Sequence, residues 1–276
     1  MALTKNDISN ALKNVGINYG DIVLVHSSFK SLGELQDGAE TVVSGFLQAI
    51  GDDGTLVMPT FVQKDFENAY KTWHIDKESD TGYLTNYFRR RYGSYRSNQA
   101  THSVAAFGCL AKCLTETHGE SGRRIGDMGD TPFAKDSPWE KMYQLNAKIL
   151  LLGVDPIVIT FRHYAEYCFM GECVEKLLAI GCHEDMVECL ADHNKTGVWP
   201  HLYNRVLFPR LESMGYVART KCGNAEIACI EAKVFVDYAT DCLKNSDNEV
   251  LWRVDSAWDT DAYIEWYNKF RQIVSI

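Results

Sequence analysis

The stretch Leu150-Leu151-Leu152-Gly153-Val154, followed after a short connection by Thr160-Phe161-Arg162-His163-Tyr164-Ala165-Glu166, sets the architecture of the chain. The leucine run predicts a buried β-strand that ends at Gly153. The second segment predicts an α-helix with Thr160 at its N-cap and His163 at the third helical position. The sequence therefore places His163 at a strand-to-helix junction.

His163 and Glu166 are three residues apart on this predicted helix, and side chains at that spacing are neighbours on one helix face. Glu166 can therefore orient the imidazole or stabilise its charged form. The positive end of the helix acts in the other direction, because it favours the neutral imidazole that accepts a proton. Two interpretations stay open from the local sequence: a general base, or a structural histidine that is hydrogen-bonded or at the surface.

The composition of the 276 residues, 46% hydrophobic and 12% aromatic, is enough for a large core. We expect one domain over residues 1–276, in which the part from about 167 onward is more helical and can form a second, closely packed lobe. The net charge of −9 disfavours a nucleic-acid partner. No signal pattern opens the chain, and no apolar run approaches the ~18 residues of a membrane span, so we expect a soluble, cytoplasmic protein without membrane contact.

The nine cysteines form no CxxC pair and predict neither a disulfide framework nor a zinc ribbon. Most of them are expected to be small buried residues in a reducing compartment. A metal site made by His26, His102 and His163 is conceivable if the fold brings them together, but no ligand spacing supports it. We therefore expect no metal.

Strand and helix patterns alternate before the leucine run. The sequence predicts an amphipathic helix over 4–12, a buried strand over 21–25, a helix over 39–50 and a second strand over 55–58. Strand, helix and strand in this order predict a parallel βαβ unit. Ligands of such units collect at the carboxyl ends of the strands.

Polar residues follow both of these strands. The segment 26–33 (HSSFKSLG) offers hydroxyls and backbone N–H groups that suit a phosphate, with Lys30 as a countercharge, although an ordinary connecting loop has the same composition. Thr60 and Phe61 follow the second strand. His102, in the polar segment before 104–108, is either a ligand contact or a core histidine. Residues 119–136 predict a long loop of a kind that is often functional.

The remaining chain has fewer chemical signals. Periodicity and turn residues predict a helix over 137–145, a loop over 192–199, a helix over 204–214, a hairpin around Gly223-Asn224 and a helix over 232–243. The tail carries Trp252, Trp258 and Trp266, which we expect to be packed rather than exposed.

Several segments, in order, resemble the aminoglycoside 3-N-acetyltransferase family of antibiotic N-acetyltransferases, which is unrelated to the GNAT fold. Each segment is unspecific alone, whereas the ordered set is specific and covers most of the chain, from near residue 20 to near 243. The matching segments are 25–29, 53–61, 101–108, 136–139, 148–154, 163–166 and 223–226.

The resemblance implies an α/β fold, a layered α/β/α sandwich around a mostly parallel or mixed sheet. It also implies a CoA thioester (acetyl-CoA or a longer acyl-CoA) as co-substrate, an amino sugar as acceptor, and His163 with its neighbour Glu166 as the base that removes the amine proton. We expect the acceptor beside Thr60, Phe61 and Thr160. The positions that match the family's CoA contacts, with Lys30 added as the countercharge, are His26, Ser27, Ser28, Phe29, Lys30, Ser31, Gly33, His102, Ser103 and Val104.

Two segments depart from the family pattern. Gln99-Ala100 stands in place of a His-Pro pair, and Ile157-Val158-Ile159-Thr160 stands in place of a polar Asp-Ser-Asn-Thr stretch. The missing carboxylate removes an expected contact to a polycationic drug or to the histidine. We therefore predict a biosynthetic N-acyltransferase that acts on an amino sugar, a nucleotide-linked one in the first instance, by direct transfer without an acyl-enzyme.

The main alternative is an aminoglycoside 3-N-acetyltransferase that confers antibiotic resistance. A second enzyme class is a serine hydrolase that uses Ser28 or Ser103 with His163 and Glu166. Neither serine lies in a Gly-x-Ser-x-Gly elbow, which disfavours this class. A non-catalytic CoA- or nucleotide-binding protein is the remaining alternative. The sequence leaves the oligomeric state open, a homo-oligomer included.

Overall fold

The computed structural model describes residues 2–62, 64, 71–93, 95–118, 120, 132–182, 199–252 and 260–274. Trp258, most of the predicted loop over 119–136, and all but the last residue of the predicted loop over 192–199 lie outside the described residues. Within the described ranges, no helix has both the length and the apolar composition to cross a bilayer.

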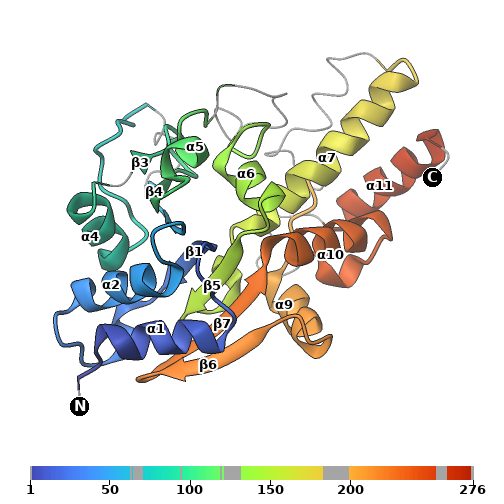
Figure 1. Cartoon of the computed structure of the whole chain (residues 1–276). Helices are drawn as coiled ribbons and strands as arrows, with labels where there is room; N and C mark the ends of the chain where they lie inside the picture. Colours follow the sequence, from blue (N-terminus) through green and yellow to red (C-terminus); the bar gives the residue numbers. More distant parts are fainter. Residues whose placement is uncertain are drawn as a thin grey trace.

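Seven strands of the described chain form one mixed sheet in the order β3-β4-β2-β1-β5-β7-β6 (Figure 1). The three central strands are parallel, with β1 between β2 and β5, and the outer strands pair antiparallel. This confirms an α/β fold with a mixed sheet. The strands are β1 Ile22–Ser27, β2 Thr55–Pro59, β3 Tyr95–Arg96, β4 Val104–Gly108, β5 Lys148–Leu152, β6 Ala218–Cys222 and β7 Ala225–Glu231.

Helices cover both faces of the sheet, which is why the central strands are apolar on both sides (Figure 1). On one face Val23 and Val25 of β1 pack with α1 Lys5–Asn14, α2 Ala39–Ile50 and α4 Tyr83–Arg91. On the other face Leu24 belongs to a second core cluster with the remaining helices. These are α5 Ala111–Thr115, α6 Pro138–Gln144, α7 Phe161–Ala179, α9 Asn204–Ser213, α10 Ala232–Lys244 and α11 Thr260–Val274.

Short 3-10 helices connect several of these elements: η1 Phe29–Leu32, η2 Pro156–Val158 and η3 Asn248–Val250. The loop predicted over 26–33 is therefore partly wrong. β1 continues through His26 and Ser27, because Ser27 pairs with Leu152 of β5, and η1 follows. Beyond residue 243, where no element was predicted, the chain forms η3 and α11.

Most predicted element boundaries in the βαβ unit are confirmed. α2 has the predicted bounds, and Thr4 with Asp7 forms a capping box at the start of α1. β2 is one residue longer than the strand predicted over 55–58, because Pro59 belongs to it, in register with Val104. The predicted hairpin is formed by β6 and β7.

Two glycines let three distant segments meet. Gly153 has a φ of 63°, and a Cβ there would lie 1.8 Å from the Ser31 hydroxyl oxygen. Gly223, with a φ of 57°, would bring a Cβ to 2.3 Å from the carbonyl oxygen of Leu32. The η1 turn, the end of β5 and the β6–β7 turn therefore approach one another closely, as only glycine allows.

Candidate active site

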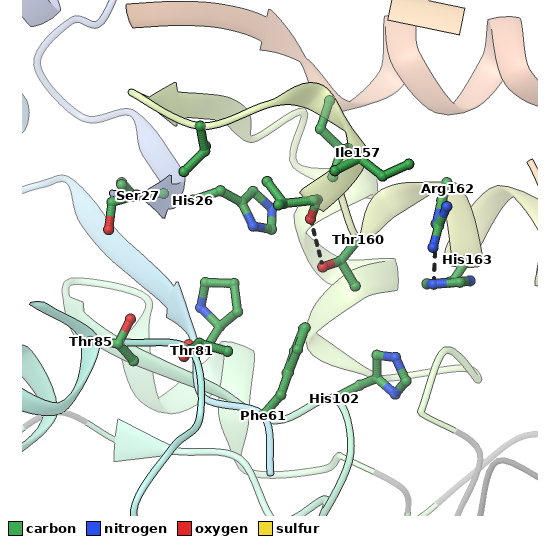
Figure 2. A pocket seen from close by; sticks show the side chains of 15 residues that line it. His26, Ser27, Phe61, Thr81, Thr85, His102, Ile157, Thr160, Arg162 and His163 are labelled. Carbon is green, nitrogen blue, oxygen red and sulfur yellow. Dashed lines mark hydrogen bonds between the residues drawn. The ribbon is translucent and has the colours of Figure 1, made fainter. Parts of the chain in front are cut away.

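A pocket of about 320 Å³ lies at the carboxyl ends of β1 and β2, beside the N-terminus of α7 (Figure 2). This is the edge of the sheet where parallel strands present ligand-binding residues. Its lining combines histidines and hydroxyls with an apolar segment from the β5–α7 connection. The lining residues are Val25, His26, Ser27, Pro59, Phe61, Thr81, Thr85, His102, Val154, Ile157, Val158, Ile159, Thr160, Arg162 and His163.

The pair predicted from helical spacing is formed. His163 Nδ1 lies 2.8 Å from Glu166 Oε2, in the first two turns of α7. The Glu166 side chain is completely buried, and it accepts two further hydrogen bonds, from the Leu202 backbone N–H to Oε1 (2.8 Å) and from Trp199 Nε1–H to Oε2 (3.2 Å). The carboxylate is thus fixed from several directions and holds the imidazole in one orientation.

The second ring nitrogen of His163 faces Arg162. The Arg162 Nε–H donates to His163 Nε2 over 3.3 Å (Figure 2). Because Nε2 accepts this bond, the neutral ring carries its proton on Nδ1 and donates it to Glu166. The His163 side chain is 19% exposed, and the lone pair of Nε2, the basic position of the neutral ring, is directed at Arg162.

Thr160 is the N-cap of α7, as predicted, but its side chain does not cap the helix. The hydroxyl lies 3.5 Å from the Val158 carbonyl, and the φ and ψ of Thr160 (−71° and −24°) are already helical. A capping side chain requires an extended backbone at this position. The Thr160 side chain lines the pocket instead.

His102 lies next to His163. Their ring centroids are 5.8 Å apart, and His102 also packs against Phe61 (5.1 Å) and Phe133 (4.8 Å). Thr101 Oγ1 is 2.9 Å from His102 Nδ1. His102 is thus a buried residue, 2% exposed, that also lines the pocket, and its contact with a ligand stays a prediction.

His26 forms another part of the pocket wall. It is 7% exposed, and its Nε2 is buried without a hydrogen-bond partner among the described residues. Burial lowers the pKa of His26 to about 4, so the ring is neutral near pH 7. Figure 2 shows the ring between Ser27 and the Ile157 segment.

The other predicted CoA contacts are spread over two places. Ser28, Phe29, Lys30, Ser31 and Gly33 lie in or beside η1 and outside the pocket lining, with Lys30 and Gly33 exposed. Ser103 and Val104 are completely buried, as is Thr60, which was expected at the acceptor.

Thr60 and Ser103 support the pocket wall from behind. The Ser103 hydroxyl lies 2.9 Å from both the carbonyl and the hydroxyl oxygen of Thr60. Arg96 holds the same residue through its Nε to the Thr60 hydroxyl (3.2 Å) and its Nη2 to the Thr60 carbonyl (2.6 Å). Among the described residues Ser103 makes no hydrogen bond to His163, so the geometry gives no serine nucleophile at this position.

His201 lies beside the pair of His163 and Glu166. Atoms of these three residues that could bind a metal all lie within 4.8 Å of one another. The set considered from the sequence was a different one, His26, His102 and His163. However, the Glu166 oxygens already accept three N–H bonds and His163 Nε2 accepts one. These bonds make His163 and Glu166 parts of a hydrogen-bonded network, in which both ring nitrogens of His163 are already engaged.

Several partners of the pair carry no signal in the sequence. Arg162 is adjacent to His163, and neighbouring residues on a helix normally point in different directions. Trp199 and Leu202 reach Glu166 from 33 and 36 residues away. No local pattern could have identified these contacts.

The apolar segment of the β5–α7 connection does face the pocket. Ile157, Val158 and Ile159 contribute to the lining, which contains no Asp or Glu among the described residues. The nearby Asp155 instead caps η2 through the Ile157 N–H (2.9 Å) and pairs with Arg205 (3.1 Å). The described part of the pocket therefore also lacks the carboxylate that the family's Asp-Ser-Asn-Thr stretch would supply at these positions.

The sequence and the fold match known acetyltransferases. A family model described as aminoglycoside 3-N-acetyltransferase matches residues 24–244. Aminoglycoside N(3)-acetyltransferase III from Salmonella sp is 33% identical over 180 residues, which is 59% of this chain and 60% of the relative. The SPbeta prophage-derived aminoglycoside N(3')-acetyltransferase-like protein YokD of Bacillus subtilis (strain 168) is 31% identical over 186 residues, 59% of this chain and 65% of the relative. The chain thus spans about 60% of the length of such curated relatives.

Solved structures with the same fold include AAC-IIIb in a binary complex with CoASH, with a TM-score of 0.70 and 16% identity over 89% of this chain and 98% of the other. A mutant of AAC(3)-IVa in complex with a gentamicin has a TM-score of 0.70 and 20% identity over 96% of this chain and 98% of the other. At these identities the structural likeness concerns the fold.

Proposed function

Because the chain belongs to the aminoglycoside 3-N-acetyltransferase family, we propose that it transfers an acetyl group from acetyl-CoA to an amino group of an aminoglycoside or a related amino sugar. The observation that carries this proposal is the pair of His163 and buried Glu166 at the edge of a pocket. The names of the relatives support the amine acceptor, and a fold neighbour that contains CoASH supports the donor.

In the proposed reaction the neutral amine attacks the thioester carbonyl carbon directly. A C–N bond forms, the C–S bond breaks, and His163 Nε2 takes the proton that the nitrogen loses. The same proton then passes to the CoA sulfur, which leaves as the thiol. Glu166 stabilises the imidazolium through Nδ1–H while the proton is on the ring.

Both halves of the chain contribute to this pocket. His26 and Phe61 come from the βαβ unit, and Thr160 and His163 come from the segment after β5. We therefore take residues 1–276 as one functional domain. All five of these pocket residues are predicted contacts: we assign Ser27, His26 and His102 to the donor, and Phe61 and Thr160 to the acceptor.

A thiol-release assay with acetyl-CoA and longer acyl-CoAs against aminoglycosides and other amino sugars tests the proposal. We expect amine-dependent release with acetyl-CoA, and the same assay gives the length of the acyl group. Tight acyl-CoA binding without release by any amine would instead indicate a binding protein.

A second candidate is a biosynthetic transferase that acts on a nucleotide-linked amino sugar. It is favoured by the apolar lining at Ile157 and Val158 and by the lack of a carboxylate in the described pocket, because a polycationic drug needs negative partners. Nucleotide-linked amino sugars in the same assay distinguish the two candidates.

A further inference from the structure

Arg162 is a pocket residue without a carboxylate partner among the described residues. Its guanidinium lies over the Trp252 ring, 5.6 Å from the centroid, and its Nη1 donates to the Leu202 carbonyl over 3.2 Å. Its Nε donates to His163 Nε2. No ion pair joins Arg162 to an Asp or Glu within the described ranges. The negative charge of Glu166 acts on Arg162, but the Glu166 oxygens accept their hydrogen bonds from His163, Trp199 and Leu202.

These contacts leave much of the guanidinium unused. An arginine side chain has five N–H donors, and the bonds to His163 and Leu202 use two of them. Burial lowers the pKa of Arg162, which reflects the cost of holding a cation away from water. The remaining N–H groups and the charge therefore favour a ligand that brings an anionic oxygen.

We propose that Arg162 binds an anionic substituent, a carboxylate or a phosphate, on the same amino sugar whose amine His163 activates. This inference rests on the proposed function and adds the class of acceptor. Arg162 is the one Arg or Lys of the described lining, which contains no Asp or Glu. The pocket therefore selects an acidic amino sugar over a polycationic one.

The position of Arg162 identifies the acceptor, and not CoA, as the source of the anion. Arg162 Nε is 3.3 Å from the nitrogen that takes the amine proton, so a group bound to the guanidinium is a near neighbour of the reacting amine. In acyl-CoA the whole pantetheine arm separates the thioester from the nearest phosphate. A donor with its thioester at His163 cannot place that phosphate on Arg162.

The bound anion also has an effect on the base. At 3.3 Å the bond from Arg162 to His163 Nε2 is long, whereas a guanidinium bound to carboxylate or phosphate makes hydrogen bonds of about 2.8 Å. An anionic acceptor therefore draws Arg162 away from Nε2. The lone pair of His163 becomes available when the amine arrives with its anionic substituent.

The test compares acceptors that differ by one anionic group, namely glucosamine, glucosamine 1-phosphate, glucosamine 6-phosphate and 2-amino-2-deoxyglucuronic acid, with kanamycin as a polycation. We expect the wild type to use at least one of the acidic sugars with a kcat/KM about ten- to a hundredfold above that for glucosamine. Arg162→Gln should raise KM for that acceptor by a similar factor and change KM for glucosamine and acetyl-CoA by less than about threefold. Arg162→Lys, which keeps the charge without the planar fork, should fall between the two.

Arg219→Gln is the matched control, because Arg219 lies on the edge strand β6, away from the pocket, and pairs with Glu212 of α9. If Arg162→Gln does not fold, competition by inorganic phosphate against the acceptor in the wild type and in Arg162→Lys decides: the proposal requires inhibition that is competitive with the acceptor and weaker in the variant.

Three results would overturn the inference. The first is an equal loss of kcat/KM for glucosamine and for the acidic sugars in Arg162→Gln. The second is a variant whose KM rises for acetyl-CoA and not for the acceptor. The third is a wild type with a higher kcat/KM for kanamycin or glucosamine than for the acidic sugars. In each of these cases acetyl transfer itself persists and the proposed function stands. If no amine releases CoA from the wild type, the proposed function fails first.

Discussion

Two histidines line the same pocket in different electrostatic settings. His163 donates from Nδ1 to a buried carboxylate and accepts an N–H bond at Nε2. His26, on β1, has a buried Nε2 without a hydrogen-bond partner among the described residues, and burial lowers the pKa of His26 to about 4. Two histidines of one pocket therefore differ in what could stabilise a proton on the ring: His163 has a buried carboxylate as its partner, and His26 has none among the described residues. The proposed role of His163 as the base depends on this difference.

The largest expected effect is a difference in kcat between variants of these two histidines. His163→Ala should lower kcat by roughly a hundredfold or more, within the usual range for loss of a general base. His26→Gln should leave kcat within about threefold and raise KM for acetyl-CoA, because His26 has no group that would stabilise a transferred proton. Steady-state kinetics of both variants measure the difference. A similar loss of kcat in both would show that the comparison is mistaken.

Replacing the Glu166 carboxylate tests whether this partner is what distinguishes His163 from His26. In Glu166→Gln the amide NH₂ faces an N–H donor in either orientation: the Leu202 backbone N–H in the place of Oε1, or Trp199 and His163 in the place of Oε2. In both orientations the imidazole loses the negative charge beside Nδ1. We expect kcat to fall about ten- to a hundredfold and the free energy of unfolding to fall by about 1–3 kcal/mol, the cost of a buried unsatisfied donor. Thiol-release kinetics and urea denaturation check the two parts. Normal kcat with lowered stability would assign Glu166 a structural role only.

The smallest expected effect concerns stability against pH. The pKa of His26 is about 4 in the folded chain and about 6.5 in an unfolded one, so between these values the unfolded state binds more protons. Stability attributable to His26 is therefore present above pH 6.5 and lost as pH falls toward 4, with a contribution of about 2 kcal/mol lost by pH 5.

Urea denaturation at pH 7 and pH 5 measures this contribution, with His26→Gln as the reference that does not titrate. His118, whose pKa burial also lowers to about 4, is present in both proteins and cancels in the comparison. An equal pH dependence in wild type and variant would mean that His26 is charged or solvated in the folded state.

Local patterns in the sequence were sufficient to predict the central strands and the contact between His163 and Glu166. Apolar runs at 21–25 and 150–154 predicted buried strands, and the spacing of His163 and Glu166 predicted their contact, because both depend on residues close in the chain. The family was also recognised from ordered short segments, and the match over residues 24–244 confirms it.

The rest depends on contacts between distant residues. The burial of Thr60 follows from Ser103 and Arg96, which are 43 and 36 residues away. Arg162 was visible beside His163, but its bond to Nε2 depends on how Leu202 and Trp252 hold the guanidinium. The preference for a nucleotide-linked acceptor likewise came from one apolar segment, and the relatives favour an aminoglycoside-type amine instead.

The position of β5 in the sheet has a consequence for the order in which the protein is made. β5 pairs with β1, about 125 residues earlier, and with β7, about 80 residues later, as in the registers Val23↔Lys148 and Lys148↔Glu231. Such pairings give a high contact order and slow folding. On the ribosome, the segment with His163 and Glu166 emerges before Leu202 and before the strand that completes the sheet beside it. The hydrogen bonds that fix Glu166 can therefore form only after Trp199 and Leu202 have been synthesised.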